Sequence, residues 1–369
     1  MKRAFIPALV LVASLIVQNL LTAAENTPFF IGTYTGGASE GIYASSLSPS
    51  DGSLAQPKLV AKLENPSFLV IHPTQKVLYA VSEVSAGEVV AYAIQANHEL
   101  KELNRTSTGG SAPCHISIDA TGSVAMIANY GGGSIMAVEL KEDGSLGKTK
   151  LIQHEGSSVH PRQKAPHGHC ILPDPSNKFA CAVDLGLDQV LIYPIDTSAK
   201  TLKDQHAALK VAPGSGPRHI AFHPDNKHAF VIHELVCRLS VCDWDSSKGS
   251  LTESQVISTL PGEFQNGFST AEVLVHPSGK FVYGSNRGHD SIAGFRFDGE
   301  KLAAIGHTPT GGKTPRNFRI DPTGTFLLTE NQISDSICCF KIDTATGKLS
   351  QTSHQLEVGT PVCIKFYTH

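Results

Sequence analysis

The sequence predicts an all-β fold, a seven-bladed β-propeller whose ring is closed by the two ends of the chain. One observation is a strand-turn-strand pattern that recurs about every 50 residues, as in repeat architectures. Another is that no sustained helical period follows the first 24 residues. The third is a repeat unit that is split between the N-terminal and C-terminal segments. The 33 glycines and 21 prolines also fit many short strands joined by tight turns.

Each copy of the pattern consists of an apolar strand, a turn with Pro or Asp before Gly or Asn, and a second apolar strand. Copies occupy residues 68–83, 115–130, 169–184, 219–234, 272–286 and 317–331. The second strands number seven: 29–34, 77–82, 124–129, 179–183, 229–233, 281–285 and 326–330. The last full unit has four strands, at 316–320, 326–330, 336–342 and 349–358. Each unit is therefore predicted to be a four-stranded blade.

The two ends of the chain complete one blade. Strand 29–34 has no first strand before it, and segment 361–367 resembles a first strand that lacks its second. Pairing of these two segments closes the ring and protects its sheet edges. A solenoid is the alternative, but solenoids need polar caps. We therefore expect a single domain over residues 25–369.

The first 24 residues are typical of a secretory signal peptide. Met1, Lys2 and Arg3 precede an apolar run at 4–17, and Thr22-Ala23-Ala24 gives the small residues expected at a cleavage site. The run is short for a membrane span. We expect an exported protein, periplasmic or secreted, with no membrane attachment after cleavage; an uncleaved anchor is the alternative.

The bulk composition excludes several classes of partner. Net charge is −3 with no basic run, so neither nucleic acid nor an anionic membrane surface is an expected partner. Most of the eight cysteines lie in apolar strands, where thiols pack as small hydrophobes. No Cys-x-x-Cys pair exists, which argues against a structural zinc site. The only His-x-His pair, His167 and His169, has no evident third ligand, so no catalytic metal or other cofactor is expected. Cys170 and Cys181 lie equally far from a turn, which leaves a disulfide between them open.

Polar residues interrupt the repeat where its strands should meet the central channel. The segments are 164–169, 214–219, 231–234, 284–288 and 314–317. Arg218 and Arg316 take equivalent places before a first strand, and His167 is predicted at about the same place in its own unit. The histidines of the His-Pro turns, His72, His223 and His276, recur at one turn position and are interpreted as scaffolding.

These segments resemble the seven-bladed propeller lactonases, which include bacterial 6-phosphogluconolactonases and fungal carboxymuconate lactonizing enzymes. The resemblance runs from about residue 30 to 366 and depends on Pro-His-x-His, Gly-Pro-Arg-His, His-Glu and Ser-Asn-Arg-Gly motifs. It implies catalytic roles for His167, Arg218, Glu234 and Arg287. Two departures are the Leu-Val-Cys after Glu234 and the signal sequence, which bear on the role of Glu234 and on the substrate.

The chemistry of lactone opening suits these residue types. A His or Glu can accept a proton from the attacking water, and guanidinium groups can bind substrate anions and the developing oxyanion. Four further residues are candidates for substrate binding: His169, His219, Asn286 and Arg316. A structural role is the alternative for these histidines.

We expect a monomer that hydrolyses a small sugar-derived lactone with His- or Glu-activated water. A lactone-forming cycloisomerase and a non-catalytic binding platform are the alternatives.

Overall fold

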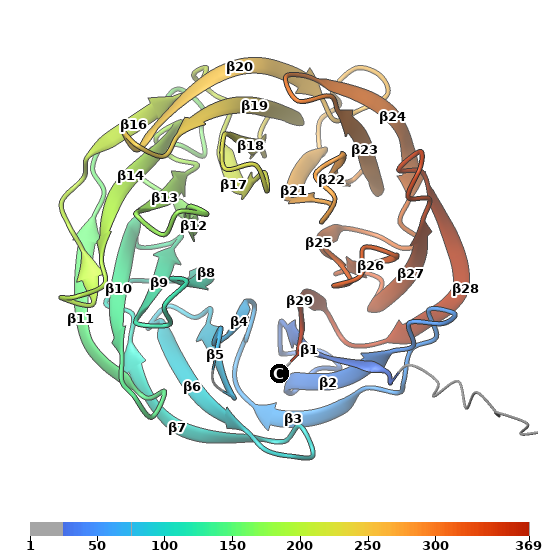
Figure 1. Cartoon of the computed structure of the whole chain (residues 1–369), viewed down its shortest axis with the longest axis horizontal. Coiled ribbons are helices and arrows are strands. Elements are labelled where there is room, and N and C mark those ends of the chain that lie inside the picture. The colour runs from blue at the N-terminus through green and yellow to red at the C-terminus, as the bar shows by residue number, and fades with distance from the viewer. Residues whose placement is uncertain (1–24, 75, 369) are drawn as a thin grey trace, which may run out of the picture.

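The computed structural model describes residues 25–74 and 76–368, and these form seven antiparallel sheets around a central axis (Figure 1). The predicted seven-bladed propeller is confirmed, and the part of the chain that the structure describes contains no helix. The predicted signal segment 1–24 lies outside the described residues.

The blades are numbered from the one that holds the N-terminal strand, and each is given from its innermost strand outward. Blade 1 contains β29 (Pro361–Phe366), β1 (Thr27–Thr33), β2 (Gly41–Leu47) and β3 (Lys58–Lys62). Blade 2 contains β4 (Leu69–Ile71), β5 (Val77–Ser82), β6 (Glu88–Ile94) and β7 (Leu100–Ser107). Blade 3 contains β8 (Pro113–Ile118), β9 (Val124–Asn129), β10 (Ser134–Leu140) and β11 (Leu146–Gln153). Blade 4 contains β12 (Gly168–Pro173), β13 (Phe179–Asp184) and β14 (Gln189–Asp196), with β15 (Thr201–Leu202) and β16 (Ala207–Lys210) both paired to β14.

The last three blades follow the same order. Blade 5 contains β17 (Pro217–Phe222), β18 (His228–His233), β19 (Arg238–Asp245) and β20 (Ser250–Ser258). Blade 6 contains β21 (Ser269–Val275), β22 (Phe281–Arg287), β23 (Ser291–Phe297) and β24 (Leu302–Pro309). Blade 7 contains β25 (Pro315–Ile320), β26 (Phe326–Asn331), β27 (Ser336–Ile342) and β28 (Leu349–Glu357).

Blade 1 closes the ring in the predicted way. β29 pairs antiparallel with β1, with Phe29 opposite Phe366 and Gly32 opposite Cys363. Figure 1 shows the red C-terminal strand beside the blue N-terminal one. Because the innermost strand of this blade comes from the far end of the chain, the ring closes through a full sheet ladder.

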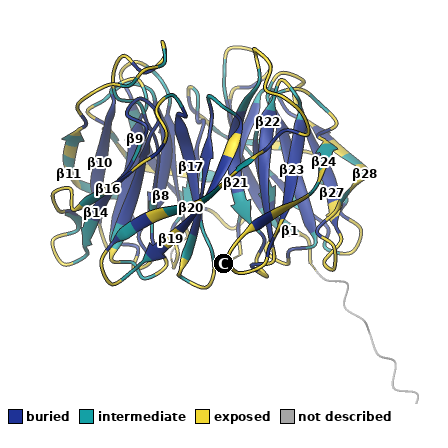
Figure 2. Ribbon diagram, turned by 90° about the horizontal axis from the view of Figure 1, so that it is seen from above, coloured by how far each residue is buried: buried dark blue, intermediate teal, exposed yellow. Residues whose placement is uncertain are grey.

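The core lies between neighbouring blades, because the inner strands of each blade are covered on both faces. Every residue of β5 and of β9 is buried, whereas β7 alternates between exposed and half-buried positions. Figure 2 shows the buried inner strands in dark blue and the exposed loops in yellow. This explains why inner strands are continuous apolar runs and outer strands alternate.

Side chains at both ends of the strands join each blade to the next. At the ends of the first strands, the Nε2–H of a His-Pro histidine donates to a glycine carbonyl in the next blade: His72 to Gly122 at 3.0 Å, His223 to Gly279 at 3.0 Å and His276 to Gly324 at 2.8 Å. The interpretation of these histidines as scaffolding is therefore confirmed. At the opposite ends, Asn Nδ2 groups donate to threonine carbonyls of the preceding blade: Asn129 to Thr108 at 3.3 Å, Asn286 to Thr259 at 2.7 Å and Asn331 to Thr310 at 3.1 Å.

The cysteines are buried and carry free thiols. The disulfide left open between Cys170 and Cys181 does not form, since Cys170 faces Val183 and Cys181 faces Leu172 in the ladder. The offset is already present beside the turn, where Pro173 faces Ala180. Across residues 25–74 and 76–368, we find no helix of the length and apolarity needed to span a bilayer.

Candidate functional site

Five blades share a β-bulge at the start of their innermost strand. In each, the ladder pairs the residues before and after one position and skips the residue between them. The skipped residues are Cys114, His169, Arg218, Arg316 and Val362. A bulge of this kind takes a residue out of the ladder and changes the direction of its side chain. The first strands therefore present five irregular residues at one height along the channel.

These five residues line a single cavity. The cavity measures about 10 Å³, close to the smallest volume that holds one water molecule, and Glu83, His219 and Asn317 also line it. The sequence-based alignment of His167 with Arg218 and Arg316 was wrong by two residues, because His169 occupies that bulge position. A cavity of this size holds no sugar, so a substrate must bind farther out.

The carboxylate of Glu234 forms ion pairs with three arginines beside this cavity, and one of them, Arg218, also lines it. Glu234 directly follows β18, and its Oε2 lies 3.0 Å from Arg218 Nε and 3.0 Å from Arg287 Nη2. Its Oε1 lies 2.7 Å from Nη2 of Arg162, which belongs to the loop before β12. Arg218 is 2% exposed, Arg287 14% and Arg162 46%, so the cluster extends from the buried channel to the solvent.

The charge of Glu234 is fixed by these partners. Burial alone would raise the pKa of its carboxyl, but the guanidiniums of Arg287, Arg218 and Arg162 outweigh burial and lower the pKa to about 2. The carboxylate is therefore ionised at neutral pH. A group with this pKa holds the arginines in place and is a weak proton acceptor.

The arginines retain donors that no protein group uses. Arg287 Nε is buried without a hydrogen-bond partner in the described structure, while Nη2 donates to the carbonyl of Thr270 at 2.8 Å. The Arg316 guanidinium lies 5.3 Å from the ring centre of Tyr34, and we find no ion pair for it among the described residues. Tyr34 donates its hydroxyl to Glu83 Oε2 at 2.7 Å. Unused guanidinium donors in a buried site favour an anionic ligand.

His167 joins the cluster through Tyr130. Its ring stacks on the Tyr130 ring at 4.6 Å between centres, and its Nδ1 lies 2.9 Å from the Tyr130 carbonyl oxygen. A carbonyl only accepts, so Nδ1 carries the proton and the neutral ring presents Nε2 as an acceptor. The Tyr130 hydroxyl in turn accepts from Arg162 Nη2 at 3.1 Å. A series of contacts through Tyr130 and Arg162 thus connects His167 with Glu234.

A second histidine lies deeper in the channel. His219 Nδ1 is 2.8 Å from Glu272 Oε1, and Asn317 Nδ2 donates to the other oxygen of Glu272 at 2.8 Å. His219 Nε2 is buried without a partner. Burial is the main cause that lowers the pKa of His219, and Glu272 opposes it. This arrangement gives His219 a neutral, oriented ring beside the cavity.

Asn286 belongs to the links between blades. Its side chain is fully buried, and its amide bonds Thr259 and Ser291. It does not line the cavity, and its predicted contact with substrate stays untested. Asn129 and Asn331 take the equivalent positions in their own blades, which indicated that Asn286 belongs to the repeat.

Sequence reasoning missed several members of the site: Arg162, Tyr130, Glu83, Tyr34 and Glu272. Arg162 lies in a loop, where the repeat gives no register, whereas Tyr34 and Tyr130 directly follow strands β1 and β9. For Glu272 a signal existed, because it is a charged residue within an otherwise apolar first strand.

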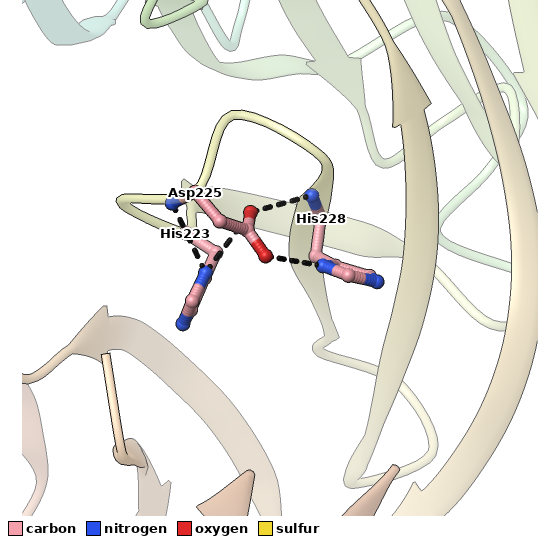
Figure 3. A group of neighbouring side chains, drawn as sticks. All are labelled: His223, Asp225 and His228. Carbon is pink, nitrogen blue, oxygen red and sulfur yellow. Dashed lines mark hydrogen bonds and ion pairs between the residues drawn. The ribbon is translucent and has the colours of Figure 1, made fainter. Parts of the chain in front are cut away.

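One group on the opposite face has the residue types of a metal site. His223, Asp225 and His228 place their ligand atoms within 4.8 Å of one another (Figure 3). Their donors and acceptors are already used, however. His223 Nδ1 accepts from the Asp225 amide at 3.2 Å, and His228 Nδ1 lies 2.7 Å from Asp225 Oδ2. The group is thus explained by the His-Pro turn and its link to blade 6.

Known proteins match this chain over most of its length. The family described as "Lactonase, 7-bladed beta-propeller" matches residues 28–366. The 6-phosphogluconolactonase of Bacillus subtilis is 38% identical over 343 residues, covering 91% of this chain and 97% of its own length. That of Formosa agariphila is 33% identical over 353 residues, covering 92% and 99%.

A solved structure extends the likeness to three dimensions. The periplasmic gluconolactonase of Pseudomonas aeruginosa superposes with a TM-score of 0.89 at 30% identity, covering 93% of this chain and 99% of that one. The chain therefore belongs to the seven-bladed β-propeller lactonase family and is a lactone-hydrolysing enzyme.

Proposed function

We propose that the chain hydrolyses a sugar-derived lactone of the gluconolactone type at the mouth of the channel. The observation that carries this proposal is the excess of guanidinium donors around Glu234, with Arg287 Nε and the Arg316 guanidinium unpaired. Such donors suit the polar oxygens of the lactone and the carboxylate of the product. The predicted monomer stays a prediction.

His167 is the proposed general base. Its Nε2 takes a proton from water while the water oxygen attacks the lactone carbonyl carbon. The resulting oxyanion is stabilised by a guanidinium group. Arg287 has a free Nε donor for this role, and Arg218 is held beside it by Glu234. The ring C–O bond then breaks, and the alkoxide takes the proton back from His167. The product is the open-chain hydroxy acid.

Glu234 is proposed to position the arginines. A carboxylate with a pKa of about 2 binds a proton too weakly to activate water efficiently at neutral pH. Its two oxygens instead fix Arg218, Arg287 and Arg162. This departs from the expectation that Glu234 contributes to water activation.

Two named relatives bear on the substrate. The Bacillus subtilis protein is named for a phosphorylated gluconolactone, and the Pseudomonas aeruginosa protein is named a periplasmic gluconolactonase. With its predicted signal peptide, this chain is proposed to work outside the cytoplasm. An unphosphorylated aldonolactone is then the preferred substrate, and the phosphorylated form is the competitor.

The test is lactone hydrolysis followed by pH-stat, with glucono-δ-lactone and its 6-phosphate compared at equal concentration. We expect turnover of the first, and His167→Ala to lower kcat by about 10²- to 10⁴-fold. His354→Ala, on outer strand β28, is the matched control and should match the parent. Full activity in His167→Ala would remove the assignment of the base, and no hydrolysis of any lactone would favour the cycloisomerase or the binding platform.

A further inference from the structure

The other end of the channel holds a larger cavity. It measures about 450 Å³ and lies at the C-terminal ends of innermost strands β4, β21, β25 and β29. The arginine cluster lies at the opposite ends of such strands, and Phe68, which lines the small inner cavity, lies between that cavity and Lys365. The walls of the larger cavity are polar and apolar in about equal parts, and Val70, Ile71, Leu274 and Phe366 contribute to the apolar part.

Two cations in this cavity break the repeat. Arg319 on β25 and Lys365 on β29 hold the same place in the ladders of neighbouring blades, opposite Leu328 and Phe30. The same place in the other blades holds Val70, Ser117, Leu172, Ala221 and Leu274. Five blades thus carry an apolar or small residue where two adjacent blades carry a positive charge.

Neither cation has an ion-pair partner among the described residues, although Lys365 helps to lower the pKa of the Glu272 carboxyl. Within the described residues, no carboxylate forms an ion pair with Arg319 or Lys365, and Lys365 Nζ lies 4.4 Å from the ring centre of Phe68. Asp321 also lines the cavity, but its carboxylate accepts hydrogen bonds from Thr323 and other groups of its own turn. Among the described residues, the site therefore has two cations and one carboxylate, Asp321, whose oxygens are used within its own turn.

A buried carboxyl lies close to these cations without forming an ion pair with either of them in the described structure. Glu330 on β26 is fully buried, and neither of its oxygens has a hydrogen-bond partner in the described structure. Burial, reinforced by Glu272, raises the pKa of Glu330 well above its usual value. Lys365 and Arg319 oppose this rise in pKa, but neither forms an ion pair with Glu330 among the described residues.

We propose that this cavity is a second binding site, for a small organic anion with a carboxylate or phosphate group on a compact apolar body. The anionic group bridges Arg319 and Lys365, and the apolar part rests against Val70 and Leu274. Charge-assisted bonds in a partly buried site are stronger than those at the surface, so each cation contributes measurably. The site is independent of the lactone chemistry at the other mouth.

Calorimetric titration of the full chain tests this site, with phenyl phosphate and benzoate as the two anionic probes and phenol as the neutral one. We expect both anions to bind and phenol to bind at least tenfold more weakly. Arg319→Met and Lys365→Met should each weaken anion binding about tenfold or more, whereas lactone turnover stays at the parental rate.

Three further variants test whether the anion binds in this cavity. Leu274→Glu places a negative charge in the cavity and should abolish this binding even if a methionine variant folds poorly. Arg287→Met, at the other mouth, should leave it intact. Lys341→Met removes an exposed cation of blade 7 and is the control for general electrostatics. Equal affinity in the parent, Arg319→Met and Leu274→Glu would overturn the proposal, as would equal losses in Lys341→Met and Arg319→Met.

Discussion

Replacing Glu234 by Gln tests whether one carboxylate holds the arginine cluster together. The partners lower its pKa from 4.5 to about 2, and each unit corresponds to about 1.4 kcal/mol, so the ionised form contributes about 3 kcal/mol of stability. Removing it leaves buried guanidiniums uncompensated, which is a costly change of the same order. Unfolding entropy of about 2 cal/mol/K per residue converts this loss into a fall in Tm of about 4 °C.

The pH dependence provides the sharper measurement. The pKa of Glu234 is lower in the folded protein, so its stabilisation is complete above about pH 4.5 and is lost as the pH falls toward about 2. Scanning calorimetry should therefore show a Tm gap between parent and Glu234→Gln that is full at pH 7 and clearly smaller at pH 3. Glu102→Gln, which breaks a surface pair with Arg105, should shift Tm by about 1 °C or less.

Two results would refute the reasoning. A Tm of Glu234→Gln equal to that of the parent at pH 7 would mean that the arginines do not depend on this carboxylate. A gap of the same size at pH 7 and pH 3 would mean that the loss comes from packing instead of charge.

Other predictions address single residues. Arg316→Met should raise the KM for anionic lactones about tenfold or more with a smaller change in kcat, as steady-state kinetics would show; unchanged kinetics would exclude Arg316 from the site. Asn286→Ala should lower the free energy of unfolding by about 1–3 kcal/mol and leave KM unchanged, and the same loss is expected for Asn129→Ala in an equivalent link. A raised KM in Asn286→Ala alone would instead support its predicted contact with substrate. In Glu272→Gln, the kinetic pKa of the enzyme should stay near its parental value if His167 is the base, and a large shift in the pH–rate profile would favour His219.

The propeller ring was predictable because it depends on a pattern that recurs along the chain. Short apolar strands, turn residues and the split unit at 29–34 and 361–367 specify seven closed blades without any knowledge of contacts. Arg218 and Glu234 were predictable for the opposite reason, since each is a charged residue at an apolar strand. Both patterns involve residues that are close together in the chain, so a single sequence is enough to detect them.

The rest depends on geometry that spacing does not reveal. His169 and Arg218 are equivalent because each is the residue that the ladder skips, and motif spacing alone does not give the ladder register. The register beside the turn of blade 4 likewise places Cys181 opposite Leu172 instead of Cys170. Arg162 and Tyr130 meet Glu234 and His167 only because loops of the folded ring approach one another.

The shared bulge also bears on how such an enzyme acquires new substrates. Cys114, His169, Arg218, Arg316 and Val362 stand at one height but take no part in the ladder of paired residues. A side chain there can be exchanged without disturbing the register of its blade. The channel thus has a set of interchangeable positions, two of which, at Cys114 and Val362, hold small uncharged residues. Those two are the natural places for selection, or an engineer, to add a new contact.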